Sequence, residues 1–239
     1  MIFDPSKPPL TDSAGLLKSV PVEAGPEIWK RATRVISSGL CDLQVNGFAG
    51  VDYNDPTLMP EEFEKSLFAM LSTGVTTCLP TVITGSEDWQ IQCFHALEAG
   101  RNASKLAQAM IPGYHLEGPF LNPEEGFCGC HPTKWMRPAT LDHFERLQEA
   151  AGGRITLVTV APEIKGVLDL IPKLVEKGIA VAIGHCNPDR DTLLRAADAG
   201  VTLSTHLGNG IAQMLPKKDN PILGQLAEDR FSASFIADG

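Results

Sequence analysis

Three short apolar segments of the sequence each end in a side chain that can bind a metal ion. One of them, YHLEGPFL, carries Glu117 at the point where a Gly-Pro pair breaks the apolar run. Packing explains this carboxylate poorly, because a buried charge is costly unless it is paired or binds a metal. Two further runs, IAVAIGH and VTLSTH, end in His185 and His206. Histidine is the side chain most often used to bind catalytic metals.

The spacing of these residues indicates how they meet. His206 follows His185 by 21 residues, and a helix plus a strand of a βαβ unit has about this length. We therefore expect both histidines at the same ends of neighbouring parallel strands, with Glu117 at the end of a third strand. One glutamate and two histidines so placed form a mononuclear site of the hydrolytic type, in which one position stays open for water.

Composition narrows the class of protein. The chain has 239 residues, 43% of them hydrophobic, which suits one large α/β domain, and its formal charge of −9 argues against nucleic acid and anionic membrane partners. No apolar run approaches the roughly 20 residues that span a bilayer, and the first ten residues do not resemble a signal peptide. The six cysteines do not form a disulfide framework, so we expect the protein to be located in the reducing cytoplasm.

A Cys-Gly-Cys-His run at residues 128–131 could suggest a structural zinc site. Such a site normally needs a second Cys or His pair, and the sequence has none at the required spacing. We interpret Cys128 and Cys130 as free thiols in a loop.

A repeated unit predicts the fold. A helical period, a glycine and a β-branched strand follow one another at 61–80, 167–184 and 192–206, and this alternation is typical of parallel strands covered by helices. A closed (β/α)8 TIM barrel needs eight strands, so we expect an incomplete barrel over residues 39–239, without its eighth strand. Residues 1–38 are rich in proline and lack a clear period, which predicts an N-terminal extension or part of a small accessory β-domain. The seven predicted strands are Cys41–Val45, Val75–Pro80, Ile111–Leu116, Ile155–Ala161, Ile179–Gly184, Val201–Thr205 and Phe231–Ala237.

Seven segments give the chain a family resemblance that covers nearly everything from residue 39 onward. It resembles the amidohydrolase superfamily and, within it, the N-acetylglucosamine-6-phosphate deacetylases. The matching segments, in family order, are GLCDLQVNGFAGVDYND, GVTTCLPT, HLEGPFLNPEEG, CHP, IGHCNP, STHLGNG and FIADG.

The resemblance implies a metal-dependent hydrolase barrel that here lacks strand eight and the return strands of an accessory β-sandwich. It assigns Glu117, His185 and His206 as ligands of one divalent metal, with Zn²⁺ as the first expectation and Fe²⁺, Co²⁺ or Mn²⁺ as alternatives. A single ion is favoured because Gln44-Val45-Asn46 replaces the His-x-His of two-metal relatives. His131 is implied as the catalytic residue at the acetyl carbonyl. The implied substrate contacts are Cys130, His131, Asn209, Gly210, Asp238 and Gly239.

The resemblance implies hydrolysis of N-acetylglucosamine-6-phosphate to glucosamine-6-phosphate and acetate. The expected small-molecule partner is therefore this amino-sugar phosphate, and we expect the chain to form a homodimer. The family places the general acid and base on an aspartate of strand eight, which we expect this chain alone to lack. Other interpretations remain open: a sister amidohydrolase acting on a different amide, or a non-catalytic, ligand-binding truncated barrel. A phosphate-binding barrel isomerase would need a glycine-rich loop after strand seven, which the sequence does not reach. Lys217 and Lys218 are candidate phosphate contacts, although a solvated turn is their default interpretation.

Overall fold

The structure is a computed structural model, and it describes residues 39–236. The extension predicted at residues 1–38 lies outside this range. So do two of the predicted substrate contacts, Asp238 and Gly239.

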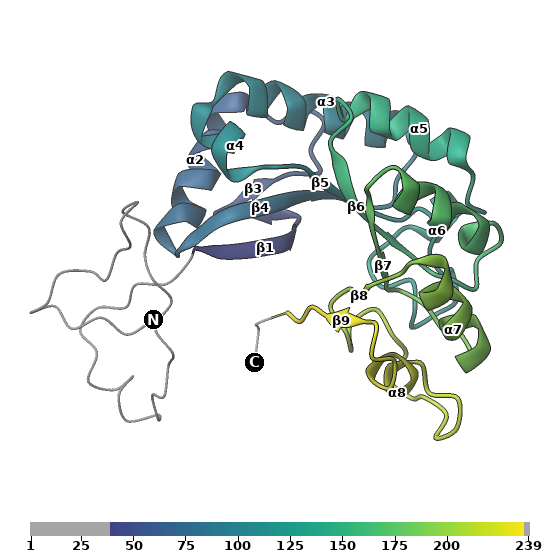
Figure 1. Ribbon diagram of the computed structural model, residues 1–239. Helices are drawn as coiled ribbons and strands as arrows, with labels where there is room; N and C mark the ends of the chain where they lie inside the picture. Colours follow the sequence, from purple (N-terminus) through teal and green to yellow (C-terminus); the bar gives the residue numbers. More distant parts are fainter. Residues whose placement is uncertain (1–38, 237–239) are drawn as a thin grey trace, which may run out of the picture. The chain divides into compact units, whose positions relative to one another are not determined.

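A seven-stranded sheet forms the centre of the described chain, and it curls from β1 at one edge to β9 at the other (Figure 1). Its strands follow one another in sequence order, and each pair from β4 to β9 is parallel. This is the incomplete (β/α)8 sheet that the repeated unit predicts. The strands are β1 (Leu40–Val45), β4 (Val75–Val82), β5 (Tyr114–Glu117), β6 (Ile155–Val160), β7 (Ala180–Ile183), β8 (Leu203–Ser204) and β9 (Ser232–Ala233).

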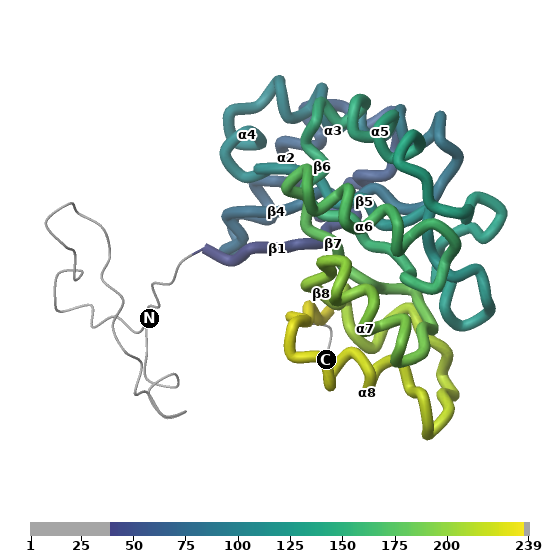
Figure 2. Tube along the Cα trace, turned by 45° about the vertical axis from the view of Figure 1, so that its right-hand side comes forward, coloured from purple at the N-terminus to yellow at the C-terminus, as the bar shows by residue number. Residues whose placement is uncertain are grey.

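Helices connect successive strands and cover the convex face of the sheet (Figures 1 and 2). Ser86, Thr140 and Asp189 cap the helices that follow them, since each side chain accepts a hydrogen bond from a first-turn N–H group. A short hairpin, β2 (Gly47–Phe48) with β3 (Val51–Asp52), follows β1. The helices are α2 (Pro60–Ser72), α3 (Glu87–Ala103), α4 (Lys105–Met110), the 3₁₀ turn η1 (Thr133–Trp135), α5 (Leu141–Ala150), α6 (Val167–Glu176), α7 (Arg190–Ala199) and α8 (Pro221–Leu226).

None of the helices in the described range combines the length and the apolar composition that a membrane crossing requires.

Alternation along the strands divides the core into two faces. Tyr114 and Leu116 of β5 belong to the large apolar cluster between sheet and helices. Because successive side chains of a strand point to opposite faces, His115 and Glu117 point into the concave interior. On this face Leu79, Leu157 and Ala182 form a small apolar cluster apart from the main core. The alternation along β5 therefore places Glu117 on the concave face, at the carboxyl end of the strand.

Candidate metal centre

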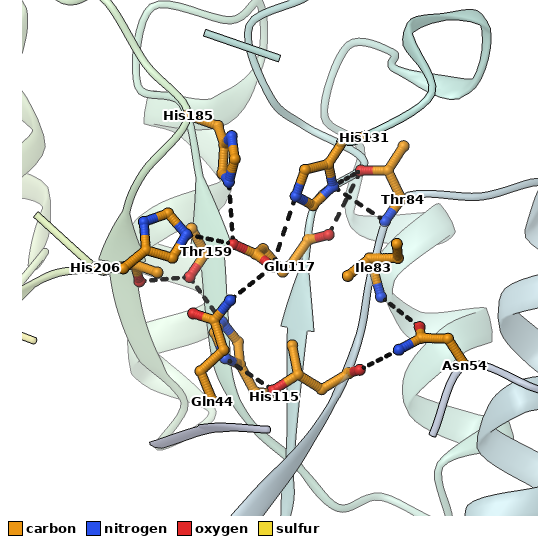
Figure 3. Close-up of polar contacts among 12 residues, drawn as sticks. Gln44, Asn54, Ile83, Thr84, His115, Glu117, His131, Thr159, His185 and His206 are labelled. Carbon is orange, nitrogen blue, oxygen red and sulfur yellow. Dashed lines mark hydrogen bonds and ion pairs between the residues drawn. The ribbon is translucent and has the colours of Figure 1, made fainter. Parts of the chain in front are cut away.

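The structure brings Glu117, His185 and His206 together at the carboxyl ends of β5, β7 and β8 (Figure 3). Their ligand atoms all lie within 4.8 Å of one another, and all three side chains are buried. Oε1 of Glu117 lies 2.9 Å from Nε2 of His206 and 3.2 Å from Nε2 of His185. Among the described residues, this is the cluster of acidic, histidine and cysteine side chains that could hold a metal ion.

Both histidines have an unusual backbone conformation. His185 has φ 50° and His206 has φ 31°, in the left-handed region that costs a non-glycine residue about 1–3 kcal/mol. Neighbouring loops hold them there. The N–H of Asn122 donates to the carbonyl of His185 at 3.1 Å, and the N–H of His206 donates to Oγ of Ser234 at 2.9 Å. Such strain persists only where the surroundings over-determine it, and it is common at functional sites.

A buried polar layer supports the cluster from below. Nε2 of His115 lies 2.7 Å from Oγ1 of Thr159, which lies 2.8 Å from Oγ1 of Thr205, while Nδ1 of His115 lies 3.1 Å from the carbonyl of Leu43. Burial lowers the pKa of His115 to about 4, so its ring is neutral at pH 7. His115 therefore connects β1, β5 and β6 beneath Glu117.

Polar groups surround the carboxylate of Glu117. Burial alone would raise its pKa, but the neighbouring His185, His206 and His131 side chains hold that pKa well below its usual range. Nε2 of Gln44 donates to Oε2 of Glu117 at 2.9 Å. Glu117 is thus ionised and is held at both oxygens.

The tautomer of His185 shows that the cluster suits a cation. Nδ1 of His185 lies 2.9 Å from the carbonyl of Phe127, an acceptor, so Nδ1 must carry a proton. In the neutral ring Nε2 is then an acceptor, and it faces another acceptor, Oε1 of Glu117, at 3.2 Å. A cation between these two lone pairs removes the repulsion. The donor set of two imidazoles and one carboxylate matches catalytic zinc sites with three protein ligands.

His131 lies beside the cluster, with its Nε2 3.6 Å from Oε2 of Glu117. Its Nδ1 accepts a hydrogen bond from the N–H of Thr84 at 3.4 Å and lies 2.9 Å from Oγ1 of the same residue. Since Nδ1 is an acceptor, the proton of the neutral ring is on Nε2, the nitrogen that faces Glu117. Burial lowers the pKa of His131 to about 4. At pH 7 this side chain is a neutral hydrogen-bond donor.

One cavity of about 400 Å³ contains the cluster. Of the predicted substrate contacts, Cys130, His131, Asn209 and Gly210 line it. Lys217 lines a different cavity, with Arg190. The cavity that contains the metal-binding cluster is also lined by Gln44, Asn46, Asp52, Asn54, Ile83, Gly129 and Ile236.

Several groups that shape this cavity or orient its histidines could not be identified from the sequence. Asn54 bonds to the carbonyl of Thr81 and the N–H of Ile83, both at 2.9 Å, and so fixes the end of β4 beside the cavity. Thr84 and the carbonyl of Phe127 set the tautomers of two histidines. The sequence carries no signal for a backbone carbonyl, and threonine is too common to stand out.

The chain is similar to several known deacetylases of amino-sugar phosphates. No family model matches the chain. An N-acetylglucosamine-6-phosphate deacetylase of Bacillus subtilis is 31% identical over 222 residues, which cover 89% of this chain and 53% of that protein. An N-acetylgalactosamine-6-phosphate deacetylase of a Shewanella species is 32% identical over 213 residues, covering 88% of this chain and 52% of the relative.

A solved structure is also similar. It is an N-acetyl-D-glucosamine-6-phosphate deacetylase variant of Mycobacterium smegmatis in complex with N-acetyl-D-glucosamine-6-phosphate. It superposes with a TM-score of 0.73 at 27% identity, over 83% of this chain and 50% of that one. The chain spans about half the length of the curated relatives it matches. Over that half, it is a homologue of the N-acetylglucosamine-6-phosphate deacetylases.

Proposed function

We propose that this chain carries the metal site of an enzyme that hydrolyses N-acetylglucosamine-6-phosphate to glucosamine-6-phosphate and acetate. One observation carries the proposal: Glu117, His185 and His206 meet beside a neutral His131 in a single cavity. The similarity to deacetylases of amino-sugar phosphates supports the choice of substrate. At about 400 Å³, the cavity lies within the size range of small-molecule sites.

Glu117, His185 and His206 would hold one divalent ion, for which Zn²⁺ is our first expectation because the ligands are two nitrogens and one oxygen. When bound, such an ion lowers the pKa of a bound water to about 7 and polarises a carbonyl oxygen. Gln44 holds the second carboxylate oxygen of Glu117, so that Oε1 stays aimed at the two histidines.

His131 would donate a hydrogen bond from its Nε2–H to the acetyl carbonyl oxygen of the substrate. That oxygen gains negative charge as the amide carbon is attacked, and a fixed donor that already points at it stabilises the transition state. Thr84 keeps the proton on Nε2 by donating its N–H to Nδ1. Because its pKa is about 4, His131 acts as a hydrogen-bond donor at neutral pH and not as an acid.

Cys130, Asn209 and Gly210 line the same cavity, and we assign them to the sugar. All six cysteines are free thiols, which fits our proposal of a cytoplasmic enzyme. The homodimer expected from the sequence stays a prediction, which sedimentation of the purified protein would test.

Acetate release tests the function. The zinc-loaded chain should release acetate from N-acetylglucosamine-6-phosphate faster than from unphosphorylated N-acetylglucosamine, and Glu117→Gln should abolish this release. The galacto epimer belongs in the same panel because one relative is a deacetylase of that sugar phosphate. Preference for a cyclic amide would favour a sister amidohydrolase. Measurable release that is equal for the parent and Glu117→Gln would contradict the proposal.

A further inference from the structure

One half-buried carboxyl group outside the proposed chemistry links the loops that carry the metal-site residues. Glu163 lies in the loop after β6, and its Oε1 accepts two hydrogen bonds. One comes from Nδ2 of Asn122, in the loop after β5, at 2.9 Å. The other comes from the backbone N–H of Asn187, in the loop after β7, at 2.5 Å. A single oxygen therefore joins three loops, and two of them follow Glu117 and His185 in the chain.

The link bears directly on the conformation of His185. Asn122, whose side chain Glu163 holds, also donates its own N–H to the carbonyl of His185 at 3.1 Å. Asn187, two residues beyond His185, is held from the other side. Since φ 50° at His185 is strained, releasing these anchors would let the backbone relax. Nε2 would then turn away from Glu117.

We propose that Glu163 is a positioning residue, whose reach and hydrogen-bond acceptor hold His185 in the strained conformation that aims Nε2 at Glu117. The inference rests on the proposed metal site. It assigns the effect to geometry and not to the negative charge of Glu163. Two observations agree with this assignment. Oε2 of Glu163 is buried and has no hydrogen-bond partner among the described residues, and burial raises the pKa of this carboxyl group, so its surroundings suit a neutral group.

Three variants separate reach from charge. Glu163→Asp keeps the charge but is one methylene shorter, so it cannot reach both partners, and we expect its zinc affinity to fall about 10–100-fold, as for other groups that orient a ligand. Glu163→Gln keeps the length and the acceptor oxygen and should stay within about threefold of the parent. Glu124→Ala removes an exposed carboxylate from the neighbouring loop and should also stay within about threefold, because exposed charges interact weakly.

A second readout needs no metal. Nitrogen NMR of the metal-free protein reports the imidazole of His185, whose Nδ1–H bonds to the carbonyl of Phe127. Glu163→Asp should shift these signals, whereas Glu163→Gln and Glu124→Ala should leave them in place. Should Glu163→Asp fail to fold, Asn122→Ala breaks the same link from the other side and is judged by the same two readouts.

The outcomes distinguish this inference from the metal-site proposal. If the parent binds zinc and Glu163→Asp binds equally well, the positioning role is wrong. Equal losses in Glu163→Asp and Glu163→Gln would also overturn it, since a variant that keeps the reach and the acceptor oxygen would then fail as badly as one that loses the reach. If the parent itself binds no zinc, the metal site fails, and the His185 signals alone decide whether Glu163 positions that ring.

Discussion

Replacing His206 by asparagine should remove zinc binding while leaving the fold intact. The change loses the contact of Nε2 with Glu117 Oε1 at 2.9 Å, and a hydrogen bond to a charged group is worth about 1.5–3 kcal/mol. It also relieves the backbone at φ 31°, because asparagine tolerates the left-handed region that costs other residues about 1–3 kcal/mol. These terms oppose each other. The free energy of unfolding of the metal-free protein should therefore change by less than about 2 kcal/mol.

Loss of a group that only hydrogen-bonds to a metal ligand lowers metal affinity roughly 10–100-fold. Zinc affinity should fall by more than this in His206→Asn, because the variant lacks a direct ligand. Urea unfolding followed by circular dichroism measures stability, and competition with a chelating dye measures affinity. Val181→Asp is the control for the scaffold: Val181 is fully buried in the main core, and an unpaired charge there costs several kcal/mol, much of a typical total stability of about 5–15 kcal/mol. Equal unfolding of both variants would show that His206 is part of the scaffold, and normal zinc binding by His206→Asn would show that it is not a ligand.

Three further predictions follow from the described contacts. Thr84→Val removes the hydroxyl 2.9 Å from Nδ1 of His131, so kcat should fall by up to about tenfold with zinc affinity unchanged; an unchanged kcat would argue against that contact. Hydrogen bonds from Arg146 lower the pKa of Glu87 from 4.5 to about 2, so its contribution to stability is present above about pH 4.5 and is lost as the pH falls toward 2. Glu87→Gln should then flatten the decline of the urea midpoint over this interval, and an unaltered slope would contradict the assignment. Leu174→Ala empties a fully buried position and should cost about 2–5 kcal/mol; a loss below 1 kcal/mol in urea unfolding would show that the core collapses around the gap.

The sequence predicts the sheet well because periodicity reports burial directly. All seven predicted strands have a counterpart in the predicted order, and α6 (Val167–Glu176) lies where the helical period of the unit at 167–184 predicts a helix. The ends are less accurate. The strand predicted from Ile111 begins at Tyr114, since Ile111 is the C-cap of α4 and its N–H still bonds to the helix. An apolar residue fits either role, so its pattern alone does not separate them.

In the candidate site, too, some residues can be predicted from the sequence and others cannot. Glu117, His185 and His206 could be chosen because residue type and position at a strand end are both visible in the sequence. The groups that orient them are not visible. The left-handed backbone of His185 and the three-loop contact of Glu163 depend on how distant loops fold against one another. No local sequence pattern reports a contact between loops that lie far apart along the chain.

X-ray absorption at the zinc edge is the most direct test of the metal site at Glu117, His185 and His206. We expect a first coordination shell of nitrogen and oxygen only, at about 2.0–2.2 Å, with two imidazoles from His185 and His206. Sulfur at about 2.3 Å would place the metal at Cys128 or Cys130 and contradict the proposed site, as would a purified protein that binds no zinc.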